Sequence, residues 1–265
     1  MNTKKIAIIG GGNLGMAIAE GLLKSNFAKP EQITITRRTI SRLQELKQRG
    51  VTVTDNNEDA IRTSEIIIIA LKPFNVKDVL AELKNSFDPQ KHIIISVVTG
   101  IFLKDLASIF NSPIPIFRAM PNTAIAIQES VTCLCAQDAT PAQTDYVKRL
   151  FDQLGITIPI DEKLMDAATV LGACGIAFAL RFIRAATQGG IEIGFDAKTA
   201  SLIAAQTVKG SAELLLKLNR HPEEEIDKVT TPKGCTIVGL NEMEHQGFSS
   251  SLIRGISSSF KKIQS

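Results

Sequence analysis

The feature that most constrains this chain is a glycine-rich segment that directly follows a short apolar run. Residues 5–15 read KIAIIGGGNLG, and an amphipathic helical pattern follows over residues 16–23. In a strand–turn–helix unit, Gly10 turns the chain tightly, Gly12 lets the backbone approach a pyrophosphate, and Gly15 lets the helix pack close to the strand. The helix N-terminus then offers free N–H groups to phosphates. The segment therefore predicts a dinucleotide site rather than an ordinary glycine-rich turn.

The end of the second predicted strand bears on which dinucleotide is bound. Residues 33–36 alternate as a strand should, and an NAD site would place an acidic residue here to accept from the ribose hydroxyls. The sequence instead has Thr36, Arg37 and Arg38. Guanidinium groups pair with a 2′-phosphate, which a carboxylate would repel. This favours NADP(H); the alternative is that both arginines merely open a basic helix over residues 39–48 and face solvent.

Composition indicates a globular protein with one large or two modest domains. The chain has 265 residues, 44% of them hydrophobic, which is ample for real cores. A net charge of +3 with interspersed charges shows no basic stripe, so we expect no nucleic-acid or anionic-membrane partner. The first apolar run is too short for a signal peptide, and no later stretch reaches about 18 uncharged apolar residues. We therefore expect a cytosolic protein.

The cysteines and histidines predict neither a disulfide framework nor a metal site. Two cysteines lie in an alternating strand pattern and are expected to be buried, and the histidines are scattered without helical i, i+4 pairing. The residues concerned are Cys133, Cys135, Cys174 and Cys235, and His92, His221 and His245.

The apolar periodicity predicts an α/β fold, a Rossmann-type wound sheet domain followed by an all-helical C-terminal dimerisation domain. The boundary is expected near residues 160–164, giving domains over 1–161 and 162–265. Strands are predicted at 6–9, 33–36, 51–54, 66–70, 92–96, 114–117, 131–136 and 156–160. Helices are predicted beyond the boundary at 175–193, 197–218 and 250–263.

The helical region is too apolar to stand alone. Residues 200–216 carry apolar side chains around most of a helix circumference, which marks a helix buried on several sides. A homodimer, or a larger homo-oligomer, built on these helices would bury them. The alternative is that the sheet domain covers them.

Taken together, the motifs resemble one family, pyrroline-5-carboxylate reductase, the last enzyme of proline biosynthesis. The resemblance covers essentially the whole chain and implies NADPH-dependent reduction of 1-pyrroline-5-carboxylate to L-proline. The motifs are IGGGNLGMAIAEGL at 9–22, LKP at 71–73, FRAMPNTA at 117–124, GACGIAFA at 172–179, and VTTPKGCTIVGLNEME at 229–244, the most specific.

The resemblance also implies roles for individual residues. The glycine-rich turn, the end of the second strand and the rim of the nicotinamide pocket would bind the cofactor. By the resemblance, Thr36, Arg37 and Asn57 would contact the ribose and the 2′-phosphate, and the nicotinamide rim would include Lys72, Pro73, Met120, Pro121 and Asn122. Together with the residues identified above from the sequence pattern, the predicted cofactor residues are Gly10, Gly12, Asn13, Leu14, Gly15, Thr36, Arg37, Arg38, Asn57, Leu71, Lys72, Pro73, Met120, Pro121 and Asn122. The substrate carboxylate would lie on a loop at Thr231, Gly234, Cys235 and Thr236, with Thr236 contacting the reacting substrate. The sequence departs from the family pattern at Lys233, Phe74, Ala173 and Ile176.

The residues of the substrate loop support the same interpretation independently. The run TTPKGCT at 230–236 is a turn that leads into an apolar-periodic stretch, so hydroxyls and N–H groups would surround a helix N-terminus. This predicts an anion cradle, although a plain N-cap has a similar pattern. The sequence shows no convincing acid–base dyad, which suits an imine, since a protonated imine accepts hydride without oxyanion stabilisation.

Two alternatives remain. A related enzyme could reduce another imine or oxidise a small β-hydroxy acid. An enzyme of the second kind would be expected to have a lysine in the helix after Gly175. The cationic residues between Gly175 and Glu192 are instead Arg181 and Arg184. A non-catalytic NADP-binding regulator would bind NADPH without oxidising it.

Overall fold

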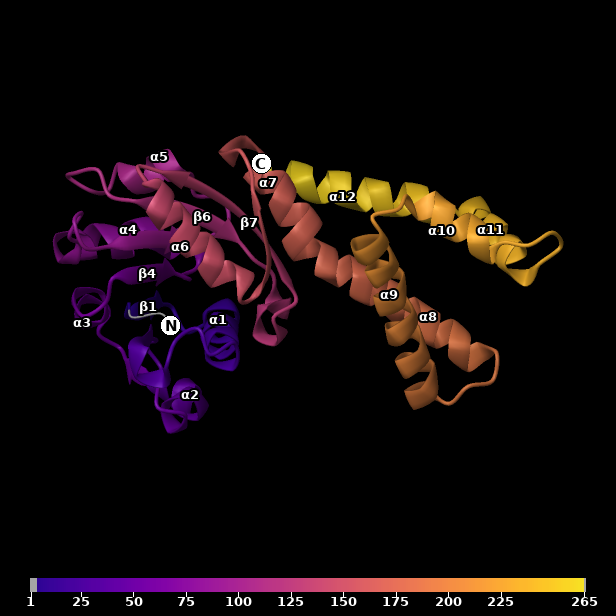
Figure 1. Cartoon of the computed structure of the whole chain (residues 1–265), viewed down its shortest axis with the longest axis horizontal. Coiled ribbons are helices and arrows are strands. Elements are labelled where there is room, and N and C mark those ends of the chain that lie inside the picture. Colours follow the sequence, from indigo (N-terminus) through magenta and orange to yellow (C-terminus); the bar gives the residue numbers. More distant parts are fainter. Residues whose placement is uncertain (1–3, 265) are drawn as a thin grey trace. The chain divides into compact units, whose positions relative to one another are not determined.

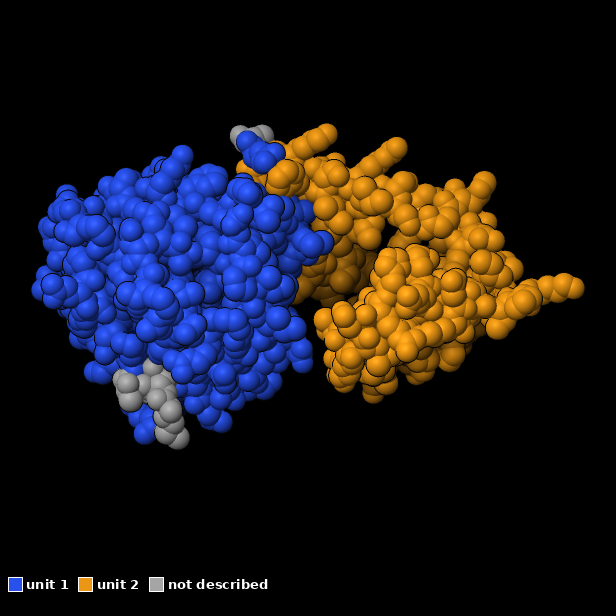
Figure 2. Space-filling model, turned by 45° about the horizontal axis from the view of Figure 1, so that its top comes forward, with its two compact units in different colours: residues 1–174, 264 blue, residues 175–263, 265 orange. Residues whose placement is uncertain are grey.

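The computed structural model describes residues 4–264 and divides into two compact units (Figures 1 and 2). A sheet unit ends at Cys174, and a helical unit covers Gly175–Ile263. The boundary proposed from the sequence, 161/162, lies upstream of this division, where the 3-10 turn Glu162–Leu164 begins.

Within residues 4–264, eight strands form one sheet in the order β3-β2-β1-β4-β5-β6-β7-β8. Each predicted strand overlaps an observed one, which confirms the predicted wound α/β sheet. Neighbouring strands are parallel except β6 and β7, which are antiparallel. The strands are β1 Ile6–Ile9, β2 Ile33–Thr36, β3 Thr52–Thr54, β4 Ile66–Ile69, β5 Ile93–Ser96, β6 Ile116–Met120, β7 Ser130–Gln137 and β8 Gly155–Pro159.

The central strands are apolar on both faces because helices cover both sides of the sheet. Every residue of β1 and β4 is buried. Ile6 and Ile8 pack into a core shared with α1 and α6, whereas Ala7 and Ile9 face a second core shared with α3, α4 and α5. The helices of this unit are α1 Asn13–Lys24, α2 Gln44–Gln48, α3 Asn57–Arg62, α4 Pro73–Leu83, α5 Leu103–Ala107, α6 Pro141–Asp152 and α7 Met165–Ala168.

Two local features differ from the simplest wound sheet. The connection from β6 to β7 holds only the 3-10 turn Thr123–Ile127, closed by Gln128 at φ 64°, and so short a link requires antiparallel strands. The basic helix predicted over residues 39–48 is correct only in its second half, since a 3-10 turn, Ile40–Leu43, precedes α2.

The described part of the helical unit contains helices and no strand, as predicted, and many of its apolar side chains are exposed. In α9, Leu202 and Leu216 are 69% and 68% exposed. One helical run among the described residues, Glu162–Glu192, is long and apolar enough to cross a membrane by length and composition alone. Its longest uncharged stretch spans residues 167–180 and is shorter than a membrane requires. The helices are α8 Gly175–Glu192, α9 Ala197–Leu218, α10 Pro222–Val229, α11 Cys235–His245 and α12 Phe248–Gln264.

Candidate cofactor and substrate sites

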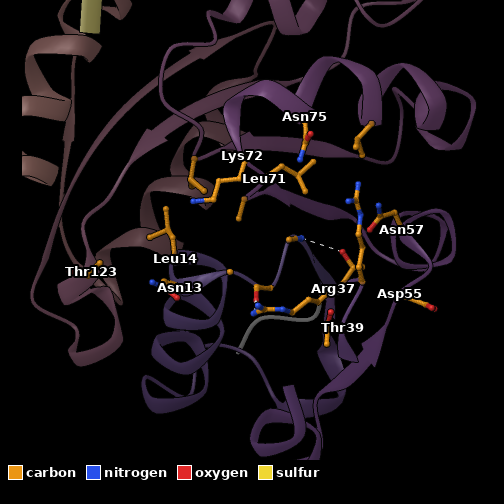
Figure 3. Close-up of a pocket in the computed structure, with 18 residues that line it drawn as sticks. Asn13, Leu14, Arg37, Thr39, Asp55, Asn57, Leu71, Lys72, Asn75 and Thr123 are labelled. Atoms are coloured by element: carbon orange, nitrogen blue, oxygen red, sulfur yellow. Dashed lines mark hydrogen bonds between the residues drawn. The ribbon is translucent and has the colours of Figure 1, made fainter. Parts of the chain in front are cut away.

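A cavity of about 640 Å³ opens at the carboxyl ends of the parallel strands, where the strand order reverses between β1 and β4 (Figure 3). This is the position at which wound sheets bind dinucleotides. Leu71, Lys72 and Asn75 lie on one side of the cavity, opposite Arg37 and Thr39. The sequence-predicted residues that line it are Gly10, Gly12, Asn13, Leu14, Thr36, Arg37, Arg38, Asn57, Leu71 and Lys72.

The glycine-rich turn has the geometry that a bound pyrophosphate needs. Gly10 has φ +112°, and a Cβ here would lie 2.5 Å from the carbonyl oxygen of Ala70. A Cβ on Gly15 would lie 2.1 Å from the carbonyl oxygen of Gly10, so only glycine lets α1 pack this closely. A Cβ on Gly12 would meet nothing within 4 Å, which leaves its backbone open to the cavity.

The N-terminus of α1 is free to bind an anion. Gly12 is the N-cap, no side chain caps the helix, and the first turn contains no acidic residue. The first N–H groups of the helix, at Asn13 and Leu14, therefore face a ligand without a competing carboxylate. The residues present thus fit a dinucleotide.

The end of β2 is tied directly to the glycine-rich turn. Gly11 N donates to Thr36 O at 2.6 Å, and Gly10 N donates to Thr36 Oγ1 at 3.2 Å. The Arg37 guanidinium is half-buried and donates from Nη1 to Gly11 O. Arg37 therefore does not simply face solvent, whereas Arg38 is exposed on the cavity wall.

The charge around the cavity suits a phosphate-bearing ligand. Its lining includes three cationic side chains, Arg37, Arg38 and Lys72, and one carboxylate, Asp55. Sequence reasoning missed eight further lining residues, most of which directly follow a predicted strand or flank a predicted contact, and position alone could have indicated those. They are Gly11, Thr39, Asp55, Ala70, Asn75, Val79, Val97 and Thr123.

Several predicted cofactor residues do not line this cavity. Gly15 packs behind the turn, and Pro73 is the first residue of α4. Met120 and Pro121 are buried at the end of β6. Asn122 is also buried, and both ends of its side-chain amide are engaged: Oδ1 accepts from Ala124 N at 3.0 Å, and Nδ2 donates to Gly172 O at 3.2 Å.

The predicted substrate loop lies in the helical unit, at the start of α11. Gly234 N donates to Thr231 O at 2.9 Å, and a Cβ on Gly234 would lie 2.6 Å from Thr231 Oγ1. Gly234 is the N-cap, no side chain caps the helix, and its first turn has no acidic residue. Thr236 is the second helical residue, so its hydroxyl is not the side-chain N-cap of α11.

Other reactive groups in the described chain do not form a competing site. Cys133 and Cys135 are half-buried in β7, and burial raises the pKa of the Cys135 thiol to about 11, so this thiol stays protonated. No group of three or more potential metal ligands occurs among residues 4–264.

Comparison with known proteins identifies the family. The chain is 44% identical to pyrroline-5-carboxylate reductase 2 of Dictyostelium discoideum, over 98% of this chain and 92% of that protein. The chain belongs to the pyrroline-5-carboxylate reductase family. It is 48% identical to pyrroline-5-carboxylate reductase 1 of the same organism over 98% of its own length, and spans about half the length, 49%, of that relative.

Models of two protein regions and a solved structure agree with this assignment. Residues 162–265 match the region described as pyrroline-5-carboxylate reductase dimerisation, and residues 5–100 match NADP oxidoreductase coenzyme F420-dependent. The crystal structure of Plasmodium falciparum pyrroline carboxylate reductase with NADP bound superposes with a TM-score of 0.90 at 27% identity, covering 99% of this chain and 98% of that one. The predicted family and fold are confirmed.

Proposed function

We propose that this chain reduces 1-pyrroline-5-carboxylate to L-proline with NADPH, the last step of proline biosynthesis. Family membership supports the reaction. The observation that carries the substrate assignment is the uncapped N-terminus of α11, which lies within the most specific family motif and lacks acidic residues in its first turn. A small carboxylate is the ligand that such a helix end favours.

The cofactor is NADP(H), which supplies the hydride. The free N–H groups at the start of α1 and the open backbone of Gly12 would hold its pyrophosphate. Arg38 is exposed on the cavity wall and would pair with the 2′-phosphate, Asn57 would contact the ribose, and Lys72 would lie at the nicotinamide end. Arg37 donates a hydrogen bond to the Gly11 carbonyl, which fixes the glycine-rich turn. Arg37 also lines the cavity and adds positive charge to it.

The substrate is held by the loop before α11. Backbone N–H groups of Cys235 and Thr236, at the start of α11, bind the carboxylate, and the Thr236 hydroxyl hydrogen-bonds the ring nitrogen. Lys233, with φ +59°, adds a cation to this loop. Holding the ring at its carboxylate and at its nitrogen fixes the orientation of the imine carbon, which hydride transfer requires.

The chemistry then needs little further help from the protein. The substrate nitrogen carries a proton taken from solvent, so hydride addition at carbon converts the iminium directly into the secondary amine of proline. No alkoxide develops, and no oxyanion hole or dedicated general acid is required. Catalysis rests mainly on positioning.

The functional unit is a cytosolic homodimer, or a larger assembly, formed by the helical unit. The exposed apolar side chains of this unit support the proposal, because a large apolar surface is unfavourable in water. The match of residues 162–265 to a dimerisation region points to the same surface.

The test is an assay of purified protein with NADPH and racemic pyrroline-5-carboxylate, following loss of NADPH absorbance. Thr236→Ala should lower kcat/KM by roughly 10- to 150-fold, because a hydrogen bond to a charged partner contributes about 1.5–3 kcal/mol. Thr236→Ser should retain much of the activity. NADPH binding without oxidation would indicate a regulator, and a Thr236→Ala variant with wild-type kcat/KM would exclude the substrate contact.

A further inference from the structure

The segment that ends the sheet unit is held in a rare conformation. Residues Thr169–Cys174 form a π-helix, η6, between α7 and α8. Single π-helical turns are rare in proteins, and those that occur are often found at functional sites. Thr169 Oγ1 donates to Met165 O at 2.9 Å, which ties the start of η6 to the preceding turn.

One buried side chain connects η6 to the end of the cofactor cavity. Asn122 follows β6, and its Nδ2 donates to the carbonyl oxygen of Gly172 at 3.2 Å. Its Oδ1 accepts from Ala124 N at 3.0 Å, and its own N–H donates to Ser130 Oγ at 3.1 Å. Asn122 therefore holds together the loop after β6, the start of β7 and the π-helix.

This connection lies beside the part of the cavity that the nicotinamide would occupy. The adenosine end of a dinucleotide lies over β2, and the nicotinamide end lies across the strand reversal. Val97, which follows β5, and Thr123, the next residue after Asn122, line the cavity on that side. A Cβ on Gly172 would lie 3.4 Å from Val131 Cγ1, so η6 also packs against β7.

We propose that Asn122 is a positioning residue. Its hydrogen bond to the Gly172 carbonyl fixes the position of η6 relative to Thr123, which lines the cavity. The inference rests on the proposed function, because it assigns an effect on hydride transfer. Both ends of the Asn122 side-chain amide already have protein partners. Asn122 therefore affects turnover by holding the backbone in place and not by contacting the cofactor. Loss of the Asn122–Gly172 bond shifts the wall of the nicotinamide end without removing a contact to the adenosine end.

The experiment replaces the donor and keeps the acceptor. Asn122→Asp retains an oxygen for Ala124 N and loses the donor to Gly172 O; Asn122→Ser makes the same loss without adding charge. Both should lower kcat by roughly 10- to 100-fold, the range that small misplacements in an active site produce. The NADPH Kd should change less than threefold, and amide hydrogen exchange in residues 169–174 should become faster.

Ser130→Ala is the matched control, because it removes another partner of Asn122 but leaves the bond to Gly172. It should lower the melting temperature with kcat within twofold of wild type. The proposal is overturned if both Asn122 variants keep wild-type kcat, if exchange in 169–174 is unchanged, or if NADPH affinity falls in parallel with turnover. A wild-type protein without turnover would refute the proposed function, while hydrogen exchange would still test the Asn122–Gly172 link.

Discussion

Removal of the Glu162 carboxylate should destabilise the sheet unit far more than its partly exposed position suggests. Glu162 Oε1 accepts from Arg118 Nη1 at 2.9 Å and from Leu103 N at 2.6 Å. The Arg118 side chain is 1% exposed, whereas that of Glu162 is 28% exposed. The Arg118 Nε and Nη2 atoms have no partner in the described chain, and its guanidinium lies 5.1 Å from the Phe102 ring centroid. Glu162 is therefore the carboxylate that neutralises a fully buried cation.

The expected magnitude follows from which partner remains. Glu162→Ala leaves an unpaired guanidinium inside the protein, and breaking a buried pair in this way costs about 3–5 kcal/mol. For a unit of this size the loss corresponds to a fall of roughly 6–20 °C in melting temperature. The neighbouring Lys163–Asp161 pair, at 3.1 Å, has side chains that are 78% and 71% exposed. Lys163→Ala should therefore change stability by about 0–1 kcal/mol and serves as the control.

Urea unfolding at fixed protein concentration measures both variants. The double variant Arg118→Met, Glu162→Gln removes the buried charge and keeps an acceptor for Leu103 N, so it should recover most of the stability lost in Glu162→Ala. A loss below about 1 kcal/mol in Glu162→Ala would show that the pair behaves like a surface pair and that the guanidinium reaches water. A double variant no more stable than Glu162→Ala would contradict the desolvation argument.

The remaining predictions concern cofactor choice, the substrate loop and assembly. Arg38→Ala should lower the affinity for NADPH by roughly 10- to 150-fold and barely affect the affinity for NADH. Arg37→Ala also releases the Gly11 carbonyl and should lower the affinity for both cofactors. If titration showed equal losses of affinity for NADPH and NADH in both variants, a 2′-phosphate contact would be excluded. Lys233→Gly should raise the free energy of unfolding by up to about 1 kcal/mol, because glycine adopts φ +59° without a Cβ penalty. The same variant should raise the KM for the substrate, because it removes a cation from the substrate loop. An unchanged KM at low salt would argue against a role for the ammonium group. Light scattering at micromolar concentration should show at least a dimer, and a soluble, active monomer of 28.7 kDa would refute the assembly proposal.

Local sequence determined much of the sheet unit and the position of its cofactor cavity. The apolar runs identified the eight strands that residues 4–264 form, because a strand buried on one face alternates apolar and polar residues and a strand buried on both faces is a continuous apolar run. The glycine-rich turn located the cofactor cavity, since its close backbone approaches exclude any side chain. These features depend on residues adjacent in sequence, so a single chain is enough to predict them.

Tertiary structure decided what depends on residues far apart in sequence. Arg37 and Arg38 are neighbours of one type, yet only Arg37 bonds the Gly11 carbonyl, because the parallel pairing of β1 with β2 brings that carbonyl to it. The pairing of Arg118 with Glu162 and the bond from Asn122 to η6 span 44 and 50 residues. No local pattern encodes such partners. Hydrogen bonds and ion pairs depend on the distance between two groups in space, and that distance is set only when the strands and helices pack together.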